Sequence, residues 1–394
     1  RIGRESLAVD TEMLLDEDHH GPHGVLAGTT GSGKSEFLQT LICSMVLEHD
    51  PRLLNLLLID FKGGSTFNVF AELPHTVGVV TNLDRDRVDR ALQALRTEIE
   101  ARQQFLEQMN VRDVTQYHRY YAPTPARIHE RSYRPLPHLF IIVDEFAQLA
   151  KEMPDFMQEL VRIAQVGRSL GLHLILGTQS PMDVITDEMN DNLQFRICLR
   201  VQNVEASRAM LRRPDAAYLP AGWPGRGYFQ VGERGMFKQF QTAYVGADYR
   251  QRNRAGGQLQ ENLVLEIITD GGKVINLMPE NDPRFMPQTA LDADDTHTTA
   301  KAIVDTITKY AKLYHVPAMP PLLLPPLVEQ VTLAPLFGYT SIGGWNGRDW
   351  HPPGYDHRGY PIRTGSAPIG LIDDVYRRTQ EPFWVHLNAG QQNS

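Results

Sequence analysis

The chain has 394 residues, of which 42% are hydrophobic and 22% charged, the balance of a globular protein with room for one or two domains. Its formal net charge of −8 excludes a basic field over the whole protein, although a local basic channel for nucleic acid stays open. The two cysteines, Cys43 and Cys198, are too few for a disulfide framework and are expected to be buried free thiols.

The sequence lacks an apolar run that approaches the ~18 residues needed to span a bilayer. It begins with Arg1 and ends inside a segment that resembles a strand. We therefore expect a piece of a longer protein, whose membrane segments, if it has any, lie outside this chain.

The first elements predicted are a short strand at residues 7–9 and an acidic loop at 16–20. His19, His20 and His23 suggest a metal site, but no cysteine or second cluster completes a ligand set. We expect a solvated loop here.

A glycine-rich segment, GTTGSGKS at 28–35, lies between an apolar run at 25–27 and an amphipathic helical pattern at 36–49. This is the pattern of a phosphate-binding loop, whose glycines let backbone N–H groups turn toward an anion at the positive end of a helix dipole. Lys34 is expected to reach the β- and γ-phosphates of ATP, and Ser35 to bind Mg²⁺. The alternative is a glycine-rich turn that caps an ordinary helix. The residues expected to hold the nucleotide are Gly28, Thr29, Thr30, Gly31, Ser32, Gly33, Lys34, Ser35 and Glu36.

A continuous apolar run at 54–60 ends in Asp60, which is typical of a central parallel strand buried on both faces. A strand at 75–82 and a long helix at 86–109 follow. Residues 111–137 are rich in proline and predict a loop-rich connection.

A second apolar run, at 139–143, ends in Asp144 and Glu145. Downstream of a phosphate-binding loop, this pattern indicates that Asp144 orders the Mg²⁺ shell and that Glu145 is the catalytic base for the attacking water.

A helix at 155–169 leads to a strand at 173–179 that ends in Gln179. Since parallel strands end at one edge of a sheet, Gln179 is placed to sense the γ-phosphate or its water. The alternative is a strand-terminal glutamine bonded to the backbone.

Strands that alternate with helices predict an α/β fold with a mostly parallel central sheet and a ligand beyond the carboxyl ends of the strands. The later elements expected are strands at 195–201, 228–231 and 240–245, a hairpin at 263–277, a helix at 298–314 and a proline-rich stretch at 316–326.

Five segments resemble the FtsK/SpoIIIE family of ring motors: GTTGSGKSE at 28–36, LLIDFKGG at 57–64, LPHTVGVVTNL at 73–83, FIIVDEF at 140–146 and GRSLGLHLILGTQ at 167–179. The resemblance implies a RecA-like P-loop NTPase core with flanking helices, Mg²⁺-dependent ATP hydrolysis, and a ring oligomer, expected to be a hexamer.

Within this family, four segments resemble the first ATPase domain of the EccC/EssC proteins of type VII (ESX) secretion: 74–83, 207–220, 225–232 and 240–250. The resemblance covers residues 1–250, the expected ATPase domain. Beyond it we expect an appended hairpin and helix at 251–315, a proline-rich linker at 316–340, and at 341–394 either the start of a following ATPase domain or an interdomain segment.

The resemblance implies a motor that energises export of protein substrates across the bacterial cytoplasmic membrane. Its expected partners are copies of itself, neighbouring ATPase domains of the same chain, other membrane components of the secretion system and secreted proteins. The expected location is the cytoplasmic side of the cell membrane, as a soluble domain of a membrane-anchored protein.

A ring motor needs a cation from the neighbouring subunit. By resemblance to the E-x-R-R-type helix of the family, Arg102 is the first candidate and Arg168 the second. A surface salt bridge is the alternative for each arginine.

Two other functions stay open. The segment QSPMDVIT at 179–186 is closer to the DNA-translocating branch of the family, so a double-stranded DNA translocase is the first alternative. The second is a nucleotide-binding regulatory module that the linker at 316–340 holds inactive.

Overall fold

The computed structural model describes residues 2–4, 10–15, 19–61, 66–81, 85–121, 134–181, 187–232, 235–249 and 298–324, together with the segments 266–268, 274–276, 327, 330–331, 344–345, 350–351, 366–374 and 379–386. The strand expected at 7–9 and part of the acidic loop, 16–18, lie outside the described residues.

A ten-stranded mixed sheet forms the centre of the fold, in the order β2-β1-β10-β9-β8-β3-β7-β6-β4-β5. Neighbouring strands from β8 to β5 run parallel, and β9, β10, β1 and β2 extend the sheet antiparallel. The strands are β1 (Gly3–Arg4), β2 (Asp10–Thr11), β3 (His23–Ala27), β4 (Leu54–Asp60), β5 (Thr76–Val80), β6 (His138–Asp144), β7 (Leu172–Thr178), β8 (Phe195–Leu199), β9 (Arg226–Val231) and β10 (Met236–Thr242). The predicted α/β fold with a mostly parallel sheet is confirmed.

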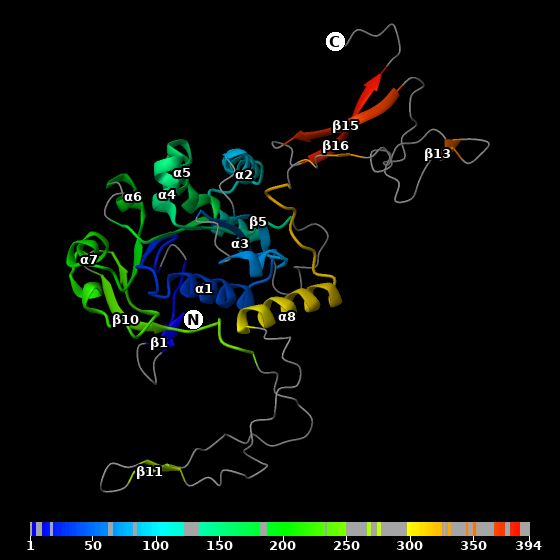
Figure 1. Ribbon diagram of the computed structural model, residues 1–394. Helices are drawn as coiled ribbons and strands as arrows, with labels where there is room; N and C mark the ends of the chain where they lie inside the picture. The colour runs from blue at the N-terminus through cyan, green and yellow to red at the C-terminus, as the bar shows by residue number, and fades with distance from the viewer. Residues whose placement is uncertain are drawn as a thin grey trace.

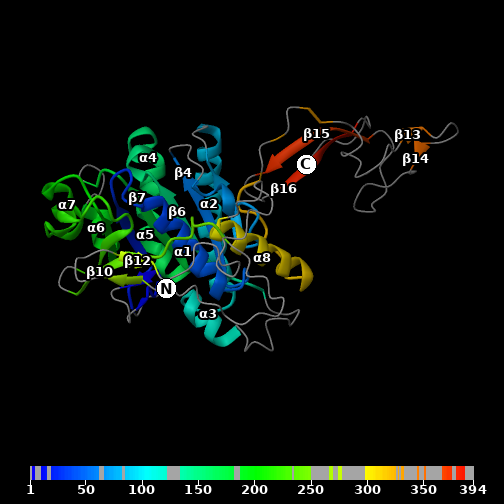
Figure 2. The same ribbon diagram turned by 60° about the horizontal axis from the view of Figure 1, so that its bottom comes forward.

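Helices cover both faces of this sheet, with α2, α4 and α5 on one face and α1 and α8 on the other (Figure 1). Figure 2 again shows α8 beside α1. The helices are α1 (Lys34–Glu48), α2 (Arg85–Gln108), α3 (Val114–Tyr121), α4 (Phe146–Glu152), α5 (Pro154–Leu170), α6 (Asp187–Asn192), α7 (Val204–Leu211) and α8 (Thr299–Leu313), with 3₁₀ turns at Asn68–Phe70 and Asp215–Tyr218.

The two hydrophobic cores explain why the central strands are apolar throughout. In β4, Leu56 and Leu58 pack with α1, whereas Leu57 and Ile59 pack with α2 and α5. Because successive side chains of a strand face opposite sides of the sheet, a strand covered on both faces needs an apolar residue at each position. Cys43 and Cys198 are buried free thiols, as expected.

Two local expectations are wrong, and one helix is missing from the prediction. The connection at 111–137 contains α3, which begins after Asp113, whose carboxylate accepts the backbone N–H of Gln116 at 2.6 Å and caps the helix. The helix α4, with Phe146 and Leu149 buried, was not predicted. His23 is not in a solvated loop, because it is the first residue of β3 and is buried.

Beyond the sheet, β11 (Glu266–Ile268) and β12 (Val274–Asn276) form the predicted antiparallel hairpin. Residues 316–324, expected as linker, run back to the sheet, where the backbone N–H of buried Leu322 donates to Val77 O in β5 at 2.7 Å. The pairs β13 (Gly344–Trp345) with β14 (Trp350–His351) and β15 (Ser366–Asp374) with β16 (Thr379–His386) follow. Among the described residues, none of the helices combines the length and the apolar character required to cross a membrane.

Candidate nucleotide-binding site

The phosphate-binding loop is fixed by backbone bonds to both neighbours of β3. Gly28 N donates to Thr178 O of β7 at 3.1 Å, and Thr29 N donates to Arg200 O, just after β8, at 3.0 Å. The strands on both sides of β3 therefore hold the first two residues of the loop in place.

Gly33, immediately before α1, needs to be a glycine for two reasons. Its φ is 93°, in the left-handed region that side chains disfavour. A Cβ there would also lie 2.7 Å from the backbone nitrogen of Gly225, which donates to Ser32 O at 2.7 Å. This support of the loop by residues 224–225 is not apparent from the sequence.

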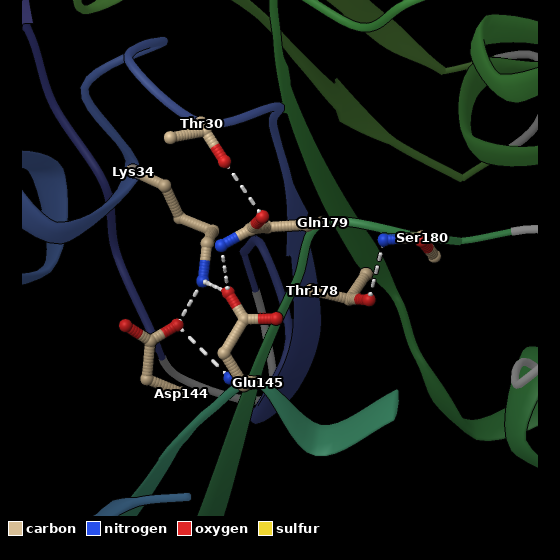
Figure 3. Close-up of polar contacts among 7 residues, drawn as sticks. All are labelled: Thr30, Lys34, Asp144, Glu145, Thr178, Gln179 and Ser180. Carbon is tan, nitrogen blue, oxygen red and sulfur yellow. Dashed lines mark hydrogen bonds and ion pairs between the residues drawn. The ribbon is translucent and has the colours of Figure 1, made fainter. Parts of the chain in front are cut away.

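Lys34 is buried between two carboxylates (Figure 3). Its Nζ donates to Asp144 Oδ1 and, at 2.6 Å, to Glu145 Oε1. Asp144 ends β6 and Glu145 follows it, so the strand brings both carboxylates to the carboxyl edge of the sheet, where the loop also lies. Buried ionic groups need such partners, because an unpaired charge there costs several kcal/mol.

Gln179 links Glu145 to the phosphate-binding loop (Figure 3). Its Nε2 donates to Glu145 Oε1 at 2.6 Å, and its Oε1 accepts the Thr30 hydroxyl at 2.9 Å. The structure thus brings together the side chains of Lys34, Asp144, Glu145 and Gln179, as the sequence predicted. The Thr30 hydroxyl is a connection that the sequence did not indicate.

Glu145 has a left-handed backbone, with φ 59° and ψ 41°. For a residue other than glycine this conformation costs about 1–2 kcal/mol. It lies between the end of β6 and the start of α4, where the backbone N–H of Glu145 donates to Asp144 Oδ1 at 3.0 Å. This turn directs the Glu145 carboxylate toward Lys34 and Gln179.

The residues present fit a nucleotide with a magnesium ion. Ser32 is buried, and its hydroxyl has no hydrogen-bond partner within the described residues, as expected of a loop built to receive an anion. Ser35 is the second residue of α1, and Asp144 supplies a carboxylate oxygen, the ligand type that Mg²⁺ prefers. Lys34, Ser35 and Asp144 would hold the phosphates and the ion.

Arg102 lies at the opposite edge of the sheet. Its guanidinium is only 3% exposed and donates to Glu98 Oε1 at 2.6 Å, Leu170 O at 2.8 Å and Pro137 O at 2.7 Å. The two carbonyls precede β7 and β6, at the amino ends of those strands. This placement corrects the expectation for Arg102, because a buried guanidinium bonded on three sides has no face to offer a neighbouring subunit. Arg168, in the last turn of α5, is exposed.

A profile of the FtsK/SpoIIIE family matches residues 2–183, which include the loop, both carboxylates and Gln179. The chain contains an FtsK/SpoIIIE-family ATPase domain. Membership of this family implies nucleotide binding and P-loop NTP hydrolysis.

Curated relatives of this FtsK/SpoIIIE domain belong to type VII secretion systems. The chain is 40% identical over 323 residues to the type VII secretion system protein EssC of Staphylococcus aureus, covering 81% of the chain and 21% of EssC. It is 38% identical over 326 residues to the ESX secretion system protein YukB of Bacillus subtilis, covering 81% of the chain and 20% of YukB. The chain thus spans about a fifth of the length of these relatives.

A solved structure shows the same relationship. The cytoplasmic domain of the Thermomonospora curvata type VII secretion ATPase EccC superposes with a TM-score of 0.73 at 29% identity, covering 98% of this chain and 38% of that one. The FtsK/SpoIIIE domain described here is therefore related to the EssC and EccC proteins.

Proposed function

We propose that this domain is a Mg²⁺-dependent ATPase motor, the first ATPase domain of a type VII secretion protein, which energises export of protein substrates. The observation that carries the proposal is the buried contact of Lys34 with Asp144 and Glu145 beside the phosphate-binding loop. The 40% identity to EssC supports the secretion role.

The side chains have separate tasks in this proposal. When bound, ATP supplies the phosphoanhydride bond and Mg²⁺ neutralises its charge. When the nucleotide binds, Lys34 would donate to a phosphate oxygen instead of to Glu145. The Glu145 carboxylate would then be free to accept a proton from the attacking water. Asp144 would hold the water shell of the ion. Gln179 fixes the position of Glu145 relative to the phosphate-binding loop, because it bonds to both Glu145 and Thr30.

A ring of copies, proposed as a hexamer, supplies the cation from a neighbouring subunit. Arg168 is the remaining one of the two arginine candidates, since its side chain lies on the surface whereas that of Arg102 is buried. Arg168→Ala is expected to lower hydrolysis about 10³-fold or more at protein concentrations where the ring forms. Full activity of that variant at high concentration would exclude Arg168.

The other proposed partners follow from the relation to EssC and EccC. They are further ATPase domains of the same chain, membrane components of the secretion system and the secreted proteins, with the domain on the cytoplasmic side of the cell membrane. DNA is a less favoured partner, because the net charge is −8 and the relatives described above act in secretion.

Steady-state ATP hydrolysis over a protein concentration series tests the proposal, with Lys34→Ala as the inactive control. Each series is run with and without double-stranded DNA, at low and at physiological salt. A rate of ATP hydrolysis that rises steeply with protein concentration and is the same with and without DNA supports a ring-forming secretion motor. DNA stimulation that weakens with salt through counterion release would favour the translocase instead.

Repression by the linker is a second candidate role, favoured by the bond from Leu322 N to Val77 O and by the burial of Leu322. Removing residues 316–340 is then expected to raise turnover. Unchanged turnover in the shortened chain would count against the repressing role.

A further inference from the structure

A carboxylate in the first turn of α1 has no task in phosphate chemistry. Glu36 follows Ser35, and its Oε2 is buried without a hydrogen-bond partner within the described residues. Burial raises the pKa of this carboxyl above its usual value. A buried acceptor left unpaired is costly, and a ligand with a donor group would satisfy it.

Tyr244 and Gly246 lie against this carboxylate. A Cβ built on Gly246 would lie 2.8 Å from Glu36 Oε2 and 2.8 Å from the Tyr244 hydroxyl. The carboxylate oxygen of Glu36 and the hydroxyl of Tyr244 therefore both lie next to Gly246. The Tyr244 side chain is 62% exposed. An exposed aromatic ring beside an unpaired acceptor matches a flat base that carries an amino group.

The segment that holds Tyr244 is fixed to α1. The Thr40 hydroxyl donates to Ala243 O at 2.9 Å, and Ala243 N donates to Ile2 O at 3.1 Å. Glu36 and Tyr244 are therefore held in one place relative to the phosphate-binding loop.

The sheet order shows which end of a nucleotide reaches this place. Glu145 and Gln179 follow β6 and β7, on one side of β3, whereas Tyr244 follows β10, on the other side beyond β8 and β9. An extended nucleotide with its terminal phosphate at Glu145 would have room for its base on the other side of β3. Glu36 and Tyr244 lie on that side.

We infer that Glu36 and Tyr244 form the base subsite of this nucleotide site and recognise adenine, an inference that rests on the proposed ATPase function. The Tyr244 ring stacks on the base. The Glu36 carboxylate accepts a hydrogen bond from the exocyclic amino group of adenine. Hypoxanthine, the base of ITP, has a carbonyl oxygen at that position, which the carboxylate repels.

Dissociation constants of ATP and ITP, measured by calorimetry in the Glu145→Gln background to suppress turnover, test this inference. The parent protein is expected to bind ATP about tenfold to hundredfold more tightly than ITP, the value of a hydrogen bond to a charged group. Glu36→Ala should bring that ratio close to one. Tyr244→Ala should raise the dissociation constants of both nucleotides about tenfold, whereas Tyr244→Phe, which keeps the ring, should leave them unchanged.

Two matched variants control for unspecific effects. Glu48→Ala removes a glutamate at the far end of α1, and Tyr249→Ala removes a nearby exposed tyrosine; both should bind ATP and ITP as the parent does. Equal binding of ATP and ITP by the parent overturns the base assignment, and this comparison needs no variant to fold. Weaker binding in Trp223→Ala but not in Tyr244→Ala also overturns it, since Trp223 is an exposed aromatic residue next to Pro224 and Gly225, which lie against Gly33.

The outcomes separate this inference from the proposed function. Failure of the parent to bind either nucleotide contradicts the ATPase proposal. Binding of both nucleotides that Lys34→Ala abolishes, with no effect of Glu36→Ala or Tyr244→Ala, contradicts the base subsite alone.

Discussion

The two edges of the parallel sheet bury polar groups in different ways. At the carboxyl edge, Lys34 bonds to the side chains of Asp144 and Glu145. At the amino edge, two of the three partners of Arg102 are backbone carbonyls. A ligand can replace a side-chain partner, whereas a carbonyl that belongs to the end of a strand stays in place. The first arrangement suits binding and the second suits stability.

Histidines complete the amino edge. His138 Nδ1 and His173 Nε2 lie 2.8 Å apart, and Leu174 N donates to His23 Nδ1 at 3.1 Å. Burial lowers the pKa of His23 to about 4 and that of His138 to about 3, and it lowers the pKa of His173 well below its usual value. These rings are therefore neutral at pH 7, in contrast to the charged groups of the carboxyl edge.

The largest effect is expected from the carboxyl edge. Glu145→Gln removes the charge of the proposed base but keeps an acceptor for Lys34 and Gln179. Steady-state turnover should fall about 10²- to 10⁴-fold, the usual contribution of a general base, while ATP binding measured by calorimetry persists. Turnover at the parent rate would remove Glu145 from this role.

At the amino edge, Arg102→Met should lower stability rather than act on catalysis. It leaves Glu98 and two backbone carbonyls without their donor, so the free energy of unfolding measured in urea should fall by about 3–5 kcal/mol. Arg4→Met is the control, because the ion pair of Arg4 with Asp10 lies on the surface and its loss should cost at most about 1 kcal/mol. A stable Arg102 variant that has lost ring-dependent hydrolysis would restore the role of this arginine between subunits.

Acid should lower the free energy of unfolding, because the buried histidines at the amino edge of the sheet must then take up protons on unfolding. Because the unfolded chain binds a proton near pH 6.5 and folded His23 only near 4, the stability that neutral His23 contributes is complete above 6.5 and is lost as pH falls toward 4. At pH 5 the loss is about 2 kcal/mol for this histidine. Urea unfolding from pH 7.5 to 5 measures it, and His23→Asn, which keeps an acceptor for Leu174 N, should flatten the curve. An unchanged slope in that variant would contradict this assignment.

The smallest effect should come from the link between the phosphate-binding loop and Gln179. Thr30→Val removes one neutral hydrogen bond, worth about 0.5–1.5 kcal/mol, so turnover should fall about two- to tenfold. Thr30→Ser keeps the hydroxyl and should match the parent. Equal losses in both variants would show that the bond to Gln179 is not the cause.

Most of the fold and the proposed catalytic groups could be predicted because their signals are local. Apolar runs that end in Asp60, Asp144 and Gln179 mark strands buried on both faces, and all three ends lie at one edge of the sheet. The helix α3 was missed because its apolar face is only Val114 and Tyr117, too short a pattern to stand out from a loop.

The sequence by itself determined the phosphate-binding loop, the strands that carry Asp144 and Glu145, and the family, since each is encoded in consecutive residues. Only the tertiary structure decided the tasks of Arg102, Glu36 and His23. Arg102 bonds to Glu98, 4 residues away, but also to Pro137 O and Leu170 O, which are 35 and 68 residues away. His23 accepts from Leu174 N, 151 residues away, and Glu36 lies near Tyr244, which follows β10. Arginine, glutamate and histidine have the same side chains whether buried or exposed, so their chemistry follows from what the folded chain places beside them.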